Sequence, residues 1–234
     1  MLTALVGIVA LSSCTRERVI VPSKKVITDK IFVEDFDELR IGSAFTCYVD
    51  FENHEDLILE VNENLMEYVD VRIVDGELRI DLEDRVNVRK GAELTAYVGA
   101  KYLKGLSASG ASRIYLRDKM SASDIRLDVS GASRIKGDVD ADYAIARISG
   151  ASDLDLEGYV KDMELDGSGA SNITGYSLET EYLDLELSGA SRAELSNDGE
   201  MDLRLSGASV FRYRGNGVIT SIETSGASKV ERTK

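Results

Sequence analysis

Seven copies of the tetrapeptide Ser-Gly-Ala-Ser contain the residues that most resemble a catalytic motif, because serine is a common nucleophile. A catalytic serine is usually unique and needs a nearby base, yet the chain has one histidine, His54, and the seven copies are equivalent. The repetition therefore predicts a structural role and no catalytic residue. The first Ser and the Gly of each copy are Ser109 and Gly110, Ser130 and Gly131, Ser149 and Gly150, Ser168 and Gly169, Ser188 and Gly189, Ser206 and Gly207, and Ser225 and Gly226.

Three acidic residues, Asp153, Asp155 and Glu157, alternate along one expected strand. Alternate residues of a strand lie about 7 Å apart, and two carboxylates at that distance suit inverting glycoside hydrolysis. One repeat earlier, however, the equivalent positions are Arg134 and Lys136. Stacked repeats would place Asp153 beside Arg134 and Asp155 beside Lys136, and cationic neighbours lower the raised pKa that a general acid needs. We therefore expect a surface charge ladder here.

Composition disfavours most metal, cofactor and nucleic-acid chemistry. A single histidine makes a His-based metal site improbable, and no cofactor is expected. The acidic residues Asp35, Asp37 and Glu38 are interpreted as a solvated cap, with a weak cation site as the alternative, and His54 as a polar loop residue. The formal net charge of −14 argues against nucleic acid as a partner, because phosphate binding needs clustered Lys and Arg.

The elements that position these residues follow from the repeat, whose copies are spaced by 18 to 21 residues. Such a fixed period predicts a solenoid. The third residue before each copy is apolar, as Leu106 is, and so is the second residue after it, as Ile114 is. The alternation predicts β-strands running through the motif, with the Gly and the second Ser facing inward and the first Ser and the Ala facing outward. A helix would place a destabilising Gly in its interior in every copy.

The chain divides at about residue 104. Residues 105–234 are predicted to form the regular solenoid, with variation in repeat length absorbed by turn-rich connections at Gly137, Gly158 and Gly175. Residues 26–104 are predicted to form an irregular β part without a clear repeat. It has a hairpin turn at Asp75-Gly76, a possible helical turn within 62–69, and Cys47 as a small buried strand residue. No row of exposed aromatic residues is evident.

The N-terminus reads as an export and anchoring segment. Residues 1–13 carry no charged side chain and suit the apolar region of a signal peptide. Leu11-Ser12-Ser13-Cys14 resembles the lipobox of bacterial lipoproteins, which implies that Cys14 is lipidated and begins the mature chain. Residues 14–25 then read as the lipidated cysteine and a tether without a packed element.

The lipobox, the irregular first half and the Ser-Gly-Ala-Ser strands together resemble the bacterial family of putative auto-transporter adhesins with a head GIN domain. Residues 33–41 look like the opening strand of that family, and residues 74–80 look like its next recurrent block. The resemblance implies a single-stranded, right-handed parallel β-helix with coils of about 19–20 residues and a cell-envelope location. It implies no established biochemical activity.

Three functions remain open from the sequence. The first is a non-catalytic envelope lipoprotein, adhesive or structural, held at the outer membrane or cell surface by its lipid and contacting a protein or glycan partner. The second is a polysaccharide-binding or polysaccharide-active β-helix protein. The third is a periplasmic accessory protein that senses or scaffolds envelope components.

Overall fold

The computed structural model describes residues 18–233 and folds them into an all-β solenoid of parallel stacked strands, as the repeat predicts. The N-terminal elements are β1 (Arg18–Ile20), β2 (Val26–Ile31), β3 (Glu38–Ile41), β4 (Thr46–Phe51), β5 (Asp56–Asn62), the short 3₁₀ helix η1 (Met66–Tyr68), β6 (Val69–Val74), β7 (Glu77–Leu82), β8 (Val86–Val88) and β9 (Leu94–Ala100). The regular strands are β10 (Gly105–Ala108), β11 (Arg113–Leu116), β12 (Met120–Val129), β13 (Arg134–Ile148), β14 (Asp153–Gly167), β15 (Asn172–Leu187), β16 (Arg192–Leu205), β17 (Val210–Arg214), β18 (Val218–Thr224) and β19 (Lys229–Arg232).

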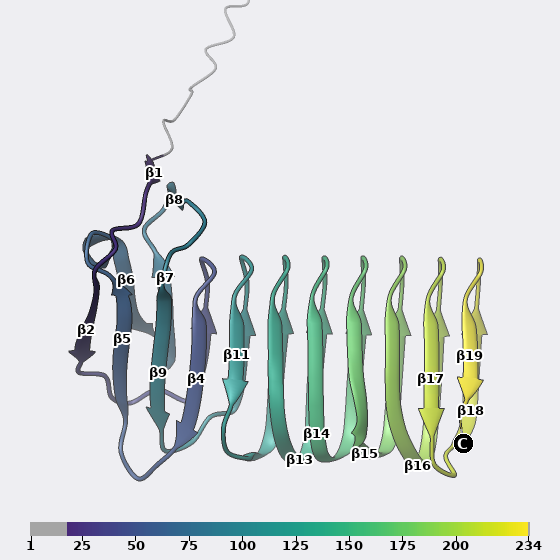
Figure 1. The fold of residues 1–234 in the computed structure, drawn as a ribbon. Helices are drawn as coiled ribbons and strands as arrows, with labels where there is room; N and C mark the ends of the chain where they lie inside the picture. The colour runs from purple at the N-terminus through teal and green to yellow at the C-terminus, as the bar shows by residue number, and fades with distance from the viewer. Residues whose placement is uncertain (1–17, 234) are drawn as a thin grey trace, which may run out of the picture.

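Each regular coil has two extended segments joined by a tetrapeptide turn. The turns form the row of loops along the upper edge of the stack in Figure 1, and the chain bends back along the lower edge. Coils pair in parallel and in register, so that Leu106 lies beside Leu127 and Ile114 beside Ile135. Differences in repeat length appear as register shifts near Asp155 and after Gly175, which confirms that the connections absorb them.

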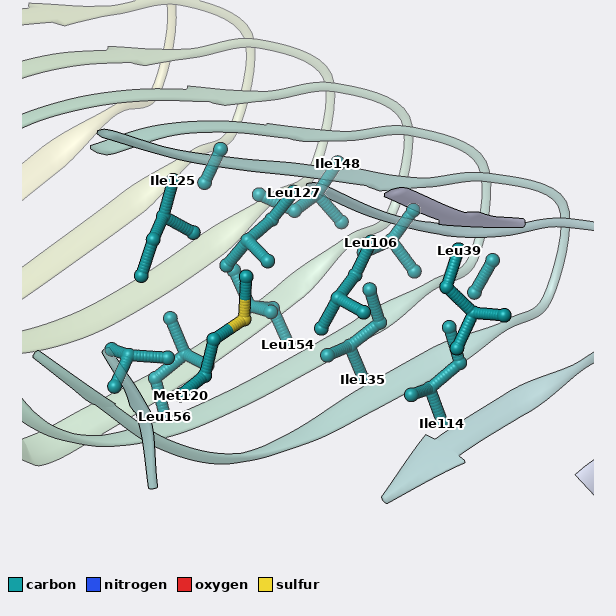
Figure 2. Close-up of a cluster of buried hydrophobic side chains, with 14 of the residues drawn as sticks. Leu39, Leu106, Ile114, Met120, Ile125, Leu127, Ile135, Ile148, Leu154 and Leu156 are labelled. Atoms are coloured by element: carbon teal, nitrogen blue, oxygen red, sulfur yellow. The ribbon is translucent and has the colours of Figure 1, made fainter. Parts of the chain in front are cut away.

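The core is a set of aliphatic columns that run along the solenoid axis. Leu106, Leu127, Ile114 and Ile135 point into the space between the two walls, where they pack on their neighbours (Figure 2). Each column repeats one buried position of the coil, and burial at about 0.8 kcal/mol per CH₂ supplies the main stabilisation. Among the apolar residues three positions before each tetrapeptide, only Ile222 is exposed, at 51%, because no later described coil covers it.

One coil of the stack was missed in the sequence. Strands β3 and β4 pair in register with β10 and β11, so the turn between them, residues 42–45, lies under the first tetrapeptide. Its sequence is Gly-Ser-Ala-Phe, which keeps only the Ala of the motif. The apolar flanks keep their spacing, however, since Leu39 pairs with Leu106 and Cys47 with Ile114. Solenoid geometry therefore begins well before residue 105.

The N-terminal end of the stack is closed by antiparallel strands. Strands β7 and β9 continue the two walls beneath β3 and β4, and β6 and β5 pair antiparallel to them. The turn between β6 and β7 is Asp75-Gly76, with positive φ at both residues, as the hairpin prediction requires. The short helix η1 lies within the segment where a helical turn is expected.

The predicted tether is partly a packed element. Strand β1, within residues 14–25, pairs in parallel with β8, and the amide of Ser23 donates to the side chain of Asn64 at 2.7 Å. The single proline and the charges of this segment suggested an unpacked chain. That interpretation overlooked the alternation of Arg18, Val19 and Ile20, which places Ile20 against the core.

Candidate functional site

The tetrapeptides form tight turns at the edge of the stack, and this corrects the predicted orientation of their glycines. The second Ser is buried in the first six copies, as at Ser171, and the Ala is exposed, as at Ala170; both agree with the prediction, and only Ser228 of the last copy is not buried. The Gly was expected to face inward but is exposed, as at Gly169, where φ is +78°. Strand alternation stops at the turn, because a left-handed residue reverses the chain direction there.

The buried serine hydroxyls are engaged in closing the turns. The second Ser donates to the carbonyl oxygen of the first Ser in six copies, with distances of 2.6–2.9 Å. Ser171 also lies 3.1 Å from the hydroxyl of Ser191 in the next coil. The chain's one histidine, His54, lies in the loop between β4 and β5, away from this edge. The geometry gives these hydroxyls a structural role.

The glycines of the turns are fixed by the coil beneath them. A Cβ atom on Gly169 would lie 2.6 Å from the carbonyl oxygen of Gly150, which is closer than real Cβ contacts come. That same carbonyl accepts a 2.7 Å hydrogen bond from the amide of Ala170. Each later turn repeats this arrangement, so the Gly column permits the close backbone approach that ties one turn to the next.

The predicted charge ladder is present on the outer face of the wall formed by the first halves of β13 and β14. Arg134 contacts Asp153 at 2.5 Å, and Lys136 contacts Asp155 at 2.7 Å. Hydrogen bonding to these carboxylates raises the pKa of the Arg134 guanidinium and of the Lys136 ammonium. Two of the three carboxylates considered for glycoside hydrolysis, Asp153 and Asp155, are thus paired with cations of the preceding coil, which disfavours either one as a general acid.

A shallow groove of about 250 Å³ lies on the opposite wall, across the second halves of β13, β14, β15 and β16 and across β18. Its polar lining is mostly acidic, and Arg204 contacts two of its carboxylates, Asp184 at 2.8 Å and Asp202 at 3.2 Å. The hydroxyl of Tyr143 donates to Glu164 at 2.6 Å, which raises the pKa of this tyrosine to about 12. The polar lining residues are Tyr143, Asp162, Glu164, Tyr182, Asp184, Glu200, Asp202 and Thr220. Sequence reasoning missed this groove because its residues come from five coils.

Three half-buried tyrosines form a column near the N-terminal end. Tyr97, Tyr48 and Tyr115 come from β9, β4 and β11, and neighbouring ring centroids are 5.5 Å apart. The guanidinium of Arg117 lies 4.6 Å from the Tyr48 ring centroid. Because Tyr48 is stacked between the other two rings, its faces are unavailable to a sugar, and the column ties coils together.

The acidic residues near the start of the solenoid are mostly paired. Lys104 contacts Asp37 at 2.6 Å and lies 4.0 Å from Glu38, and the hydrogen bond to Asp37 raises the pKa of Lys104. His54 is an exposed loop residue beside Glu52. No group of three or more metal-ligating side chains within residues 18–233 is placed to hold an ion.

The structure describes one of the two cysteines. Cys47 is a free thiol, fully buried on β4 as predicted, and burial raises the pKa of its thiol well above the ordinary range. Cys14, the predicted lipidation site, lies outside the described residues. Within the described part of the chain, no helix is long and apolar enough to cross a membrane.

These features define a β-solenoid protein whose coils are closed by small-residue turns and whose walls carry paired charges. The chain belongs to the family described as putative auto-transporter adhesin, head GIN domain, whose model matches residues 35–217. The match includes the coil at 39–47 that lacks the tetrapeptide, in agreement with the structure. No curated protein matches the chain.

Three solved structures share the fold. A putative adhesin from Bacteroides fragilis has a TM-score of 0.85 and 19% identity, covering 92% of this chain and 100% of that one. A putative lipid binding protein from Parabacteroides distasonis has a TM-score of 0.75 and 15% identity, covering 93% and 100%. A putative adhesin from Parabacteroides merdae has a TM-score of 0.73 and 18% identity, covering 93% and 100%. At these identities the likeness shows the fold alone.

Proposed function

We propose that this chain is a non-catalytic envelope lipoprotein that presents a rigid β-solenoid as an adhesive or scaffolding surface. The pairing of Asp153 with Arg134 and of Asp155 with Lys136 carries the proposal, because it disfavours a catalytic role for two of the three carboxylates that the sequence offers. The hydrogen-bonded serines of the turns support it further. Membership of a family described as adhesins agrees with an extended surface for binding a partner.

A binding assay that also detects cleavage tests this proposal. The acyl-free protein is applied to arrays of glycans and of immobilised extracellular proteins, with heat-denatured protein as the control. We expect binding that depends on the native fold and no release of new reducing ends from any polysaccharide. Release of reducing ends by the native protein alone would show that it is an enzyme.

The anchor is the second part of the proposal. Strand β1 begins at Arg18, four residues after Cys14, so a lipid on Cys14 would hold the N-terminal end of the solenoid at the membrane. Cells given a fatty acid with a terminal alkyne should incorporate it into this protein, and the Cys14→Ser variant should lose the label. Equal labelling of the variant would place the lipid elsewhere.

A second candidate function is glycan binding in the groove on the wall opposite the charge ladder. Tyr182 lines this groove, is 48% exposed, and has a carboxylate beside it in each neighbouring coil, Asp162 and Glu200. An exposed ring beside carboxylate acceptors suits a sugar, which offers C–H faces and hydroxyl donors. If the groove binds glycans, Tyr182→Ala will abolish array binding. The matched control Tyr102→Ala, at a loop residue that is 43% exposed, will leave that binding intact.

A further inference from the structure

Strands β1 and β8 form a two-stranded ribbon whose two faces differ. In the parallel register Arg18 pairs with Val86, and Ile20 with Val88. Ile20, Val86 and Val88 pack against the core. Alternation therefore places Val19 of the first strand and Val21 just after it, together with Arg85 and Arg89 flanking the second strand, on the outer face, and all four are exposed.

The cations of this ribbon lack acidic partners, whereas many of those on the solenoid walls have one. Arg18, Arg85, Arg89 and Lys90 form no ion pair with any described residue. On the walls, by contrast, Arg134, Lys136, Arg147, Arg204 and Arg212 all contact carboxylates.

The acidic residues near β8 lie at the two ends of the segment that contains this strand. Glu83 and Asp84 precede β8, and Glu93, which accepts a 2.6 Å hydrogen bond from Thr95, follows it. The outer face of the ribbon thus carries unpaired positive charge on a protein whose net charge is −14.

The ribbon is also the part of the described chain nearest the proposed anchor. Figure 1 shows β1 and β8 standing beyond the turn edge at the N-terminal end of the stack. An extended chain spans at most about 3.6 Å per residue, so a lipid on Cys14 lies within about 14 Å of Arg18. Any membrane that holds this lipid is therefore within reach of the ribbon.

We propose that the outer face of the β1–β8 ribbon docks on an anionic phospholipid bilayer. The proposal rests on the proposed anchor at Cys14 and specifies how the anchored solenoid meets the membrane. Arg85 and Arg89 of this face, together with the exposed Lys90 in the turn after β8, pair with lipid phosphates, while Val19 and Val21 enter the interface between them. Charges of the distant coils are screened beyond about 8 Å at physiological salt, so they oppose the contact only weakly.

The chain contains no tryptophan, so one introduced residue reports this contact alone. All described strands lie within residues 18–232, so a chain that begins at position 14 with Cys14→Ser keeps every one of them. Val19→Trp is placed in this background, and Val218→Trp, at the far end of the solenoid, is the control. The two valines are 60% and 62% exposed. Vesicles contain phosphatidylcholine alone or with about one third phosphatidylglycerol.

We expect the fluorescence of Val19→Trp to shift to the blue with phosphatidylglycerol vesicles only, and that of Val218→Trp to stay unchanged. Replacing Arg85, Arg89 and Lys90 with Gln should weaken binding by about 100-fold, since each cation near an anionic surface contributes about fivefold. Replacing the paired Arg134, Lys136 and Arg147 with Gln should have little effect. Circular dichroism confirms folding, and Val21→Trp serves if Val19→Trp does not fold.

Equal shifts at both tryptophans, or none with either vesicle, would overturn the docking surface. The alkyne fatty-acid label at Cys14 tests the anchor separately. If Cys14 is labelled but the protein does not bind vesicles, the proposed anchor stands and the proposed membrane contact of the ribbon is wrong. If the protein binds vesicles but Cys14 is not labelled, the ribbon contact stands and the proposed anchor is wrong.

Discussion

Four small residues close each coil, and each of them has a separate physical task. In the fourth copy, Gly169 supplies a positive φ and leaves room for the carbonyl of Gly150. Ala170 ties the turn to the coil beneath through its amide, and Ser171 satisfies the carbonyl of Ser168 inside the corner. The period and the chemistry of these residues were readable from the sequence. The exposed position of the glycine could not be read in the same way, because the alternation of a strand was extended through a turn that interrupts it.

The glycine column should be sensitive to a single methyl group. Gly169→Ala meets both a disfavoured φ, worth about 1–2 kcal/mol, and the Gly150 carbonyl. Gly91→Ala is the matched control, because Gly91 has φ +93° but nothing within 4 Å of its added Cβ. We expect urea unfolding to show a larger loss of stability for Gly169→Ala than for Gly91→Ala. Equal losses of stability in the two variants would mean that the close contact of Gly169 with the Gly150 carbonyl does not affect stability.

The buried serine of a turn should matter more than its exposed equivalent. Ser171→Ala leaves the carbonyl of Ser168 without its donor inside the structure and should lower the unfolding free energy by about 1–2 kcal/mol. Ser228→Ala removes the same hydrogen bond, 2.7 Å long, at the last turn, where water replaces it. Its effect should stay below about 0.5 kcal/mol. Thermal melts of the two variants decide this.

Strands of neighbouring coils are joined by side-chain contacts as well as by the backbone. The cross-coil ion pairs follow from the repeat alone, since residues about 19 apart become neighbours. The tyrosine column could not be found this way, because β9, β4 and β11 stack out of sequence order. The coil at 39–47 was missed for a related reason: its turn lacks the motif, and only the spacing of Leu39, Ile41 and Cys47 survives.

Two tyrosine–carboxylate contacts between coils predict an alkaline loss of stability. Hydrogen bonds to Glu164 and Glu181 raise the pKa values of Tyr143 and Tyr159 to about 12. Because each folded pKa exceeds the ordinary value near 10, the stabilisation is complete below about pH 10 and is lost as pH rises toward 12. Titrating tyrosinate absorbance should show a lower midpoint for Tyr143 in Glu164→Gln. An unchanged midpoint for Tyr143 would mean that its hydroxyl does not donate to Glu164.

The whole molecule is a stack in which each coil contacts only its neighbours, and its two ends differ. The N-terminal end is closed by antiparallel strands and carries the ribbon of β1 and β8, while the last coil leaves Ile222 half exposed. The sequence predicted the solenoid because a fixed period with apolar flanks has one simple packing solution. It did not predict the ribbon, because three residues of strand carry too little pattern to distinguish them from a tether.

The account depends most on the turns lying coil over coil, and distances between their exposed alanines test this directly. Spin labels are placed at Ala132 in combination with Ala190, Ala208 or Ala227, while buried Cys47 stays unlabelled. Stacked coils lie about 4.8 Å apart, so pulsed electron resonance should give label separations that grow by about this amount per coil, over three, four and five coils. Separations that fail to increase regularly along the series would contradict the stacked solenoid.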